Sequence, residues 1–334
     1  MKLFSSFISI LVLLFLAGPQ ANGGSKQLFK IASLAPAGSV WTTQFENFAE
    51  EVREKTGGEV DFRIYPGGVM GDDIAMFRKM RVGQLHGGGF TMTGVASQVP
   101  DFRILGIPFL FHSYEEIDFV KKGLLPEFEK QFRDKGLELI AMTEVGFVYA
   151  MSTLPISDLE TFKQSKNWAP TGDPVSEKFL QTLGITPIQL IIPDVLSSLQ
   201  SGLVETVYNS FYGSIVLQWF TKTKYIVDLP YGYAYGVFVV SSQKFNKLTE
   251  KQKQVFLAAA HKHFPVLLKK TRQSNQESRL ILKQRGGQFL TLDHGTIELL
   301  KEKRNETIKQ LVPDAFSKSI QDHTFKLLEE FRKQ

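Results

Sequence analysis

The chain has 334 residues, of which 43% are hydrophobic and 22% are charged, and its formal net charge at pH 7 is +5. This length suits one large domain or two smaller ones with a substantial core. The absence of cysteine excludes disulfides, a thiol nucleophile, a thiolate metal site and a lipid attached to an N-terminal cysteine. Lysines are spread out without a basic run, which argues against nucleic-acid binding.

Residues 1–23 have the organisation of a secretory signal peptide. Lys2 precedes an apolar run at 3–16 and small residues at 21–23, so we expect cleavage after Gly23. The apolar run is too short to span a bilayer comfortably, and an uncleaved anchor is the alternative interpretation. We therefore predict that the mature chain is exported as a soluble protein.

The first part of the mature chain predicts a βαβαβ unit. Its expected elements are, in order, a strand at 27–34, a helix from Ser39, a strand at 59–65, a helix from Asp72 or Asp73, and a glycine-rich strand at 87–93. The second helix is expected to carry Ile74, Phe77 and Met80 on its apolar face.

The middle of the chain predicts connections between two lobes. A capping box at 113–116 predicts a helix that ends at Gly123. Strands are expected at 137–144 and 146–152, of which the second crosses to the other lobe, and strands at 224–230 and 235–241 return.

The segment 166–209 repeats the pattern of strand, helix, strand, helix and strand. Asp173 is placed to cap a helix that begins with Pro174, which has no N–H to leave unpaired. Trp168 and Asn209 stand at the ends of two of its strands. Ligands of open α/β sheets bind beyond the carboxyl ends of the strands, so this segment is the predicted ligand site.

A long helix and an amphipathic tail complete the chain. The capping box Thr249–Gln252 begins a helical pattern that runs towards Arg285 and contains Pro265 as a possible kink. The tail from Thr296 is also helical in pattern, and we expect it to pack on the second lobe.

Motifs for catalysis and metal binding are absent from this sequence. It has no Gly-x-Ser-x-Gly, no phosphate loop, no His-Glu-x-x-His and no Gly-x-Gly-x-x-Gly. His261 and His263 are two apart on a helix and face different directions, and His86 is interpreted as structural. Glu144 lies near the expected cleft without a partner nucleophile, so a catalytic role is disfavoured.

Aromatic and polar residues at strand ends remain as candidates for a small-molecule site. Such pockets have mostly apolar walls and a few fixed polar groups, whereas the alternative is that these residues belong to the core. The candidates are Trp41, Phe90, Thr91, Thr93, Phe147, Tyr149, Trp168, Tyr208, Asn209, Phe211, Tyr212 and Tyr235. Trp168 and Asn209 are the strongest, and we expect Trp168→Ala to weaken ligand binding with little effect on folding.

Several of these segments, in this order and spacing, resemble the solute-binding protein of tripartite ATP-independent periplasmic (TRAP) transporters. The similar segments are Phe62–Pro66, Met80–Gln84, Ile107–Phe111, Trp168–Pro170, Leu183–Pro187 and Leu199–Glu205. The resemblance implies two similar α/β lobes of the periplasmic binding protein type, joined by crossing strands, braced by a long helix and enclosing a ligand cleft. We expect lobe I at 24–150 plus 231–286 and lobe II at 151–230 plus 287–334.

The resemblance also implies a periplasmic receptor, not an enzyme, that delivers a small organic ligand to the large and small permease subunits of a TRAP transporter. Most members of the family have arginine in place of Trp168, and that arginine pairs with a substrate carboxylate. Some members bind a metal through a glutamate where this chain has Tyr208, so no metal or other cofactor is expected.

Because Trp168 cannot pair with a carboxylate, the ligand is an organic acid held otherwise or a more apolar, amphipathic molecule. A subset of the family that resembles this chain at Trp168 is associated with a tetratricopeptide-repeat lipoprotein and hydrophobic ligands. The alternatives are therefore a hydrophobic-ligand carrier with such a partner or, less favoured, an exported hydrolase.

Overall fold

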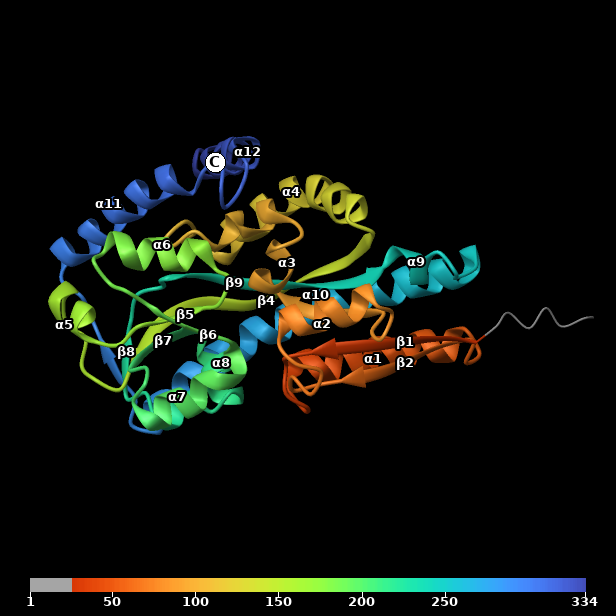
Figure 1. Cartoon of the computed structure of the whole chain (residues 1–334), viewed down its shortest axis with the longest axis horizontal. Coiled ribbons are helices and arrows are strands. Elements are labelled where there is room, and N and C mark those ends of the chain that lie inside the picture. Colours follow the sequence, from red (N-terminus) through yellow and green to blue (C-terminus); the bar gives the residue numbers. More distant parts are fainter. Residues whose placement is uncertain (1–25) are drawn as a thin grey trace, which may run out of the picture.

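The computed structural model describes residues 26–334, so the predicted signal peptide at 1–23 lies outside the described residues. Strands and helices alternate along the chain, and most strands join one large sheet that is covered by helices (Figure 1). This arrangement confirms the predicted mixed α/β fold.

The strands are β1 (Gln27–Ser33), β2 (Val60–Tyr65), β3 (Gly87–Thr91), β4 (Leu137–Ser152), β5 (Trp168–Pro170), β6 (Ile188–Leu190), β7 (Thr206–Asn209), β8 (Tyr225–Val227), β9 (Gly232–Ser241) and β10 (Gln288–Leu290). The α-helices are α1 (Val40–Lys55), α2 (Asp73–Arg81), α3 (Met92–Ala96), α4 (Tyr114–Asp134), α5 (Leu159–Gln164), α6 (Pro174–Thr182), α7 (Val195–Ser201), α8 (Phe211–Val216), α9 (Ser242–Phe245), α10 (Glu250–Gln284), α11 (His294–Leu311) and α12 (Lys318–Arg332). Short 3₁₀ helices are η1 (Pro100–Gly106), η2 (Ile192–Asp194) and η3 (Trp219–Thr221).

The large sheet runs in the order β10-β8-β4-β9-β3-β1-β2, and β7 pairs with β4 outside this order. β1 pairs in parallel with β2 and β3, as a βαβαβ unit requires. β5 and β6 form a separate parallel pair, and Asn167 bridges in parallel to Thr206 beside β7. The two predicted βαβαβ units are therefore both present.

β4 connects the two halves of the molecule. From Leu137 to Val148 it pairs with β9, whereas from Tyr149 to Ser152 it pairs with β7. The predicted break near residue 145 is a β-bulge inside one continuous strand, and Gly146 adopts the positive φ of 111° there. A bulge bends a strand without ending it, so β4 passes from one half to the other.

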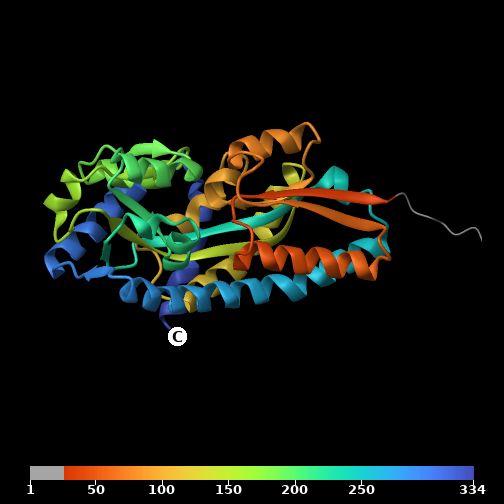
Figure 2. The same cartoon turned by 90° about the horizontal axis from the view of Figure 1, so that it is seen from below.

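α10 braces the molecule from outside the sheet. Thr249 and Gln252 form the predicted capping box, and the helix then continues for 35 residues through Pro265. Figure 2 shows α10 running along most of the length of the molecule, beside α1 at one end. It also packs on β4 and α8, so a single helix contacts both halves.

Two predicted helices differ in the structure. α4 does not end at Gly123 but continues to Asp134. Gly123 is where α12 approaches α4, since a Cβ atom there would lie 2.6 Å from Leu327 Cδ1. On α2, Ile74 is 37% exposed, and Asp73 takes a buried position on the same helix as Met76, Phe77 and Met80.

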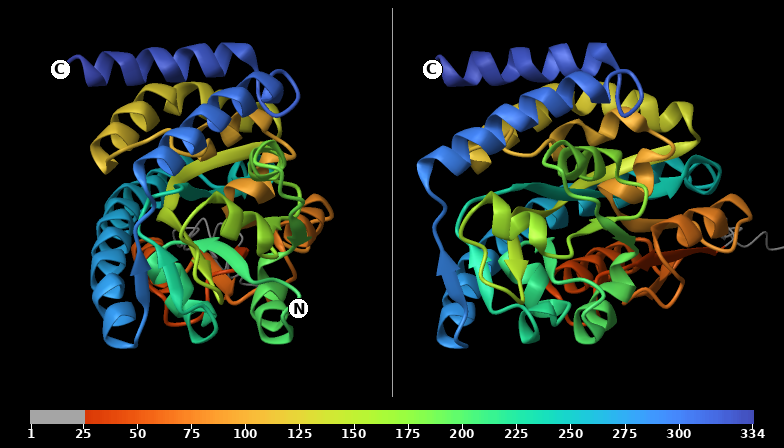
Figure 3. Two further views of the ribbon diagram at one scale, coloured as in Figure 1. Left: turned by 90° about the vertical axis from the view of Figure 1, so that its left-hand side faces the viewer. Right: turned by 60° about the vertical axis from the view of Figure 1, so that its left-hand side comes forward.

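The tail forms α11 and α12, which pack on different partners. α11 packs on α6, as expected for a tail on the second half, whereas α12 packs on α4 and η1 of the first half. Figure 3 shows α12 lying across α4 at one edge of the molecule. Buried residues form separate apolar clusters around β3 with α4 and around β7 with α6, which is the pattern expected of two lobes.

Candidate ligand-binding cavity

A cavity of about 250 Å³ lies between the two α/β units. One wall is formed by the β1–α1 loop, the start of α2 and the β3–α3 junction. The other wall is formed by β5, residues 190–192 and β7, while β4 and β9 contribute residues 143–145 and 231–236. The cavity thus lies where strands of both units end, as the fold class predicts.

The two walls touch each other around the cavity. The Tyr212 hydroxyl of α8 accepts a hydrogen bond from the Val40 backbone N–H at 2.8 Å, and the Tyr212 ring lies 4.9 Å from the Trp41 ring. A Cβ atom on Gly68 would lie 3.9 Å from Pro193 Cγ of the opposite wall. The structure is therefore a conformation in which the lobes meet.

Eight of the twelve predicted site residues line the cavity, and four do not. The lining residues are Trp41, Phe90, Thr91, Thr93, Trp168, Tyr208, Asn209 and Tyr235. The residues that the structure places outside the lining are Phe147, Tyr149 and Phe211. Tyr212, the weaker candidate, contacts Trp41 at the edge of the site without lining it.

The direction of the β4 side chains explains this division. Val148 faces the cavity, so its neighbours Phe147 and Tyr149 face the other side of the strand. Tyr149 stacks on Phe211 at a centroid distance of 4.0 Å, and Phe147 lies 4.9 Å from Tyr114. An aromatic residue near a strand end thus has two possible faces, and the sequence alone did not distinguish them.

Trp168 presents its ring, but not its N–H, to the cavity. The side chain is 3% exposed, and its Nε1 donates to the Leu190 carbonyl at 3.0 Å. Its ring also packs edge to face on Trp219 at 5.3 Å. A solute can therefore meet an apolar indole surface here, whereas the single polar group of the indole is engaged within its own lobe.

Several other predicted polar groups are also engaged by the protein. The Tyr208 hydroxyl donates to Asn167 Oδ1 at 2.6 Å, and the Tyr235 hydroxyl donates to the Phe102 carbonyl. Asn209 Oδ1 accepts from the Ser210 N–H at 2.8 Å. Burial raises the pKa of both tyrosines well above the ordinary value, so they remain neutral and contribute ring surface.

Asp73 is a cavity residue that the sequence analysis interpreted only as a helix start. Its carboxyl is 7% exposed and accepts from the Thr91 hydroxyl at 2.5 Å and from the Thr91 N–H at 3.4 Å. Burial raises its pKa to about 7, and the nearby charge of Asp72 acts in the same direction. Its pairing with Thr91, 18 residues away, is not visible in the local sequence pattern.

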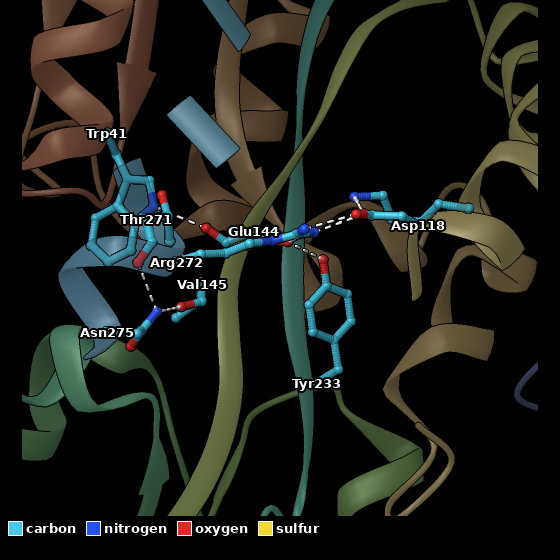
Figure 4. Close-up of polar contacts among 9 residues, drawn as sticks. Trp41, Asp118, Glu144, Val145, Tyr233, Thr271, Arg272 and Asn275 are labelled. Atoms are coloured by element: carbon cyan, nitrogen blue, oxygen red, sulfur yellow. Dashed lines mark hydrogen bonds and ion pairs between the residues drawn. The ribbon is translucent and has the colours of Figure 1, made fainter. Parts of the chain in front are cut away.

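Glu144 lines the cavity but is held by an ion-pair network (Figure 4). Its Oε1 accepts from Arg272 Nε at 2.8 Å, and its Oε2 accepts from the Tyr233 hydroxyl at 2.8 Å. Arg272 also binds both oxygens of Asp118 at 2.7 Å. Burial opposes ionisation of Asp118, but the hydrogen bonds and charges of Arg272 and Lys121 together outweigh it and lower the pKa of Asp118. Glu144 therefore fixes α10 to β4.

The charged residues of the cavity wall are all acidic. Among the described lining residues are Asp72, Asp73, Glu144 and Asp173, and none is lysine, arginine or histidine. Arg103, one of the arginines of the first half, is buried and donates to the Ala315 carbonyl at 3.3 Å. Within residues 26–334, no group of three or more His, Cys, Asp or Glu side chains could hold a metal ion.

A two-lobed α/β fold with a cavity between its lobes is the architecture of periplasmic solute receptors. The sequence profile described as "Bacterial extracellular solute-binding protein, family 7" matches residues 31–314. The chain belongs to this family, and it is a solute-binding protein of the TRAP type.

Relatives and solved structures agree with this assignment. A "Solute-binding protein" of Albidiferax ferrireducens is 22% identical over 80% of this chain and 82% of its own length. The structure of a sugar acid binding protein of Advenella mimigardefordensis, in complex with galactonate, covers 92% of this chain and 99% of its own, with 19% identity and a TM-score of 0.86. A TRAP solute-binding protein of Ochrobactrum anthropi covers 92% and 97%, with 24% identity and a TM-score of 0.80.

None of the helices in residues 26–334 combines the length and the apolarity that a membrane crossing requires.

Proposed function

We propose that this receptor captures an apolar or amphipathic small molecule, rather than a small organic acid, between its lobes. The observation that carries the proposal is the cavity wall, which combines aromatic and aliphatic side chains with acids and contains no base. A carboxylate in an enclosed site needs a cationic or N–H partner to replace its water shell. Aromatic surface instead favours apolar groups.

The backbone also offers little to a carboxylate. The N-terminus of α6 faces the cavity near Trp168 and is the obvious set of N–H donors. Asp173 already occupies it, because its Oδ1 accepts from the Val175 N–H at 3.1 Å and from the Ser176 N–H at 3.3 Å. A second carboxylate there would compete for these donors and be repelled by Asp173.

The proposed solute contacts are the lining residues of both lobes. They are Trp41, Phe90, Thr91, Thr93, Trp168, Tyr208, Asn209 and Tyr235. Trp168 contributes its indole face, which extends an apolar wall made by Leu190, Ile191 and Ile192.

We further propose that the mature protein works in the periplasm, where solute binding stabilises the closed lobes and the closed form docks on the large and small TRAP permease subunits. The proposed lobes are 24–150 plus 231–286 and 151–230 plus 287–334, with β4 and β9 as crossing strands. α12 contacts lobe I although it belongs to the proposed range of lobe II, so it would couple the two lobes.

A second candidate partner is a tetratricopeptide-repeat lipoprotein that receives the solute. Trp168 at the cavity wall favours it, because the subset of the family with this residue is associated with such a partner. Isothermal titration of the mature protein with a purified lipoprotein from the same gene neighbourhood tests this. Saturable binding supports transfer of the solute to the lipoprotein, and absence of binding contradicts such a transfer.

Mass spectrometry of the natively purified protein tests the proposed solute class. We expect a co-purifying molecule with a large apolar part, and we expect succinate to bind weakly in calorimetry. Tight succinate binding would overturn the proposal. Turnover of a co-purified molecule would instead support an exported hydrolase.

A further inference from the structure

Three of the four acids in the cavity wall already have partners that compensate their charge. Glu144 is paired with Arg272 at 2.8 Å. Asp72 and Asp173 cap helices: Asp72 Oδ1 accepts from the Ala75 N–H at 2.8 Å, and Asp173 accepts from two N–H groups of α6. Burial still raises the pKa of Asp173, and the nearby charge of Arg103 opposes this rise. A carboxylate at a helix N-terminus is stabilised by the positive end of that helix, which favours Asp73 in the first turn of α2 as well as the two caps. What Asp73 lacks by comparison is a cationic partner.

Asp73 differs from these three acids. Its hydrogen bonds come from Thr91 alone, and no salt bridge reaches it among the described residues. The bases of its own helix lie in the last turn, and of these Lys79 donates to the Met70 carbonyl at 2.6 Å. A buried carboxyl without a cation is costly in its ionised form, and its raised pKa expresses that cost. A cation delivered by the solute would remove this cost of ionisation.

Ring faces gather around the same cavity. Trp41 and Phe90 line it from the first unit, Trp168 and Tyr208 line it from the second unit, and Tyr231 lines it from the loop that precedes β9. Aromatic faces attract organic cations, and this attraction strengthens when water is excluded. Aromatic walls, an uncompensated carboxyl and no base together form the environment that selects an ammonium group.

Building on the proposed function, we infer that the solute is an amphipathic amine whose ammonium group donates to Asp73 while its apolar part lies against the aromatic walls. The ammonium N–H groups supply a further donor and the positive charge that Asp73 lacks. An uncharged alcohol supplies a donor without the charge, and a carboxylate adds a fifth acid to the wall.

Calorimetry with four probes that share one octyl chain tests the inference at pH 8. The probes are octylamine, octyltrimethylammonium, 1-octanol and octanoate. We expect octylamine to bind at least tenfold more tightly than 1-octanol, because a hydrogen bond to a charged group contributes about 1.5–3 kcal/mol. Octyltrimethylammonium has the charge without N–H donors and should fall between them, and octanoate should bind most weakly.

The variant Asp73→Asn tests the negative charge of the carboxyl, because the amide oxygen of asparagine can still accept a hydrogen bond from Thr91. We expect its affinity for octylamine to fall roughly tenfold to a hundredfold, whereas its affinity for 1-octanol stays within about twofold. Asp134→Asn is the matched control, since the Asp134 side chain is 60% exposed at the end of α4. An unchanged octylamine affinity in a folded Asp73→Asn protein would overturn the inference.

The wild-type protein provides a test that needs no variant. Besides Asp73, the ionisable groups of the described wall are the carboxyls of Asp72, Glu144 and Asp173 and the hydroxyls of Tyr208, Tyr231, Tyr233 and Tyr235. Burial raises the pKa of all four tyrosines, so their hydroxyls stay neutral between pH 5 and pH 8. Octylamine stays protonated between pH 5 and pH 8, so its affinity should rise through about pH 7 as Asp73 ionises, while that of 1-octanol stays flat. A flat octylamine profile contradicts the inference.

The outcomes separate this inference from the proposed function. If 1-octanol or octanoate binds as tightly as octylamine, the apolar solute receptor stands and the ammonium preference is wrong. If none of the four octyl compounds binds, both the apolar cavity and the ammonium preference fail.

Discussion

At the scale of single residues, the cavity places polar groups where their ordinary behaviour changes. Asp73 is nearly fully buried beside Thr91, and Trp168 is buried with its N–H donated to Leu190. Each residue therefore serves two purposes, since it contributes to the cavity wall and to the stability of its lobe. A substitution at either position should change both solute affinity and folding stability, so the two are measured separately.

Asp73 should make the stability of the protein depend on pH. Its folded pKa of about 7 lies above the unfolded value of about 3.9, so the folded state holds the proton more tightly. Proton binding by Asp73 contributes up to about 4 kcal/mol to the stability of the folded state. This contribution is complete below about pH 4 and is lost as the pH rises through about 7. We expect Asp73→Asn to gain stability relative to wild type over this window, measured by urea unfolding at pH 4.5, 6 and 8. A difference that does not vary with pH contradicts this.

Trp168→Ala should destabilise the protein, contrary to the expectation from the sequence. A side chain that is 3% exposed leaves a cavity when it is truncated, and such changes cost about 3–5 kcal/mol. Trp168→Phe keeps an aromatic face and leaves the Leu190 carbonyl unpaired, so it should cost about 1–3 kcal/mol. Chemical denaturation measures both. Leu203→Ala, at a side chain that is 48% exposed, is the control and should change stability by less than about 0.5 kcal/mol.

At the scale of elements, α10 is fixed to the crossing strand at its bulge. Asn275 is buried, and its Nδ2 donates to the Val145 carbonyl at 2.9 Å. Its Oδ1 accepts from the Tyr212 N–H at 3.0 Å. One side chain of the long helix thus pairs with backbone groups of both β4 and α8. The bulge leaves the Val145 carbonyl without a partner in the sheet, and the first turn of α8 leaves the Tyr212 N–H without a partner in the helix.

Asn275→Ala should therefore destabilise the protein more than the loss of a polar side chain usually does. The change leaves the Val145 carbonyl and the Tyr212 N–H without their partner, at about 1–3 kcal/mol for each buried group. Thermal unfolding should show a clear decrease in Tm. Gln276→Ala, one position along on the exposed face of α10, is the matched control and should have little effect. Equal effects of the two variants would show that Asn275 is not a structural link.

At the scale of the whole molecule, the contacts between the lobes set the balance between open and closed forms. The bond between the Tyr212 hydroxyl and the Val40 N–H joins α8 to the start of α1 across the edge of the cavity. Because a solute can shift closure only by its preference for the closed form, any contact present only in that form also contributes to affinity.

Tyr212→Phe should shift the free protein towards the open form. The variant keeps the ring beside Trp41 and removes the hydroxyl, a loss of about 0.5–1.5 kcal/mol of closed-state stability. We expect solute affinity to fall about two- to tenfold and small-angle scattering to show a larger radius of gyration without solute. If the affinity and the radius of gyration both match those of the wild type, the Tyr212 hydroxyl does not stabilise the closed form.

The sequence by itself determined the α/β class, the two βαβαβ units and the capped long helix, and it predicted a site at strand ends, where the candidate cavity lies. These follow from periodicity and capping, which act between residues close in the chain. Trp168 and Asn209 were placed at the cavity for the same reason.

Only the tertiary structure decided which side chains face the cavity and which charges are compensated. Phe147 and Tyr149 turn away because the pleat and bulge of β4 set their direction. α4 passes Gly123 because α12 packs there, and Glu144 is neutralised by Arg272, 128 residues away. Burial and ion pairing depend on elements that meet only in the folded chain, so no local pattern records that Asp73 is left without a cation.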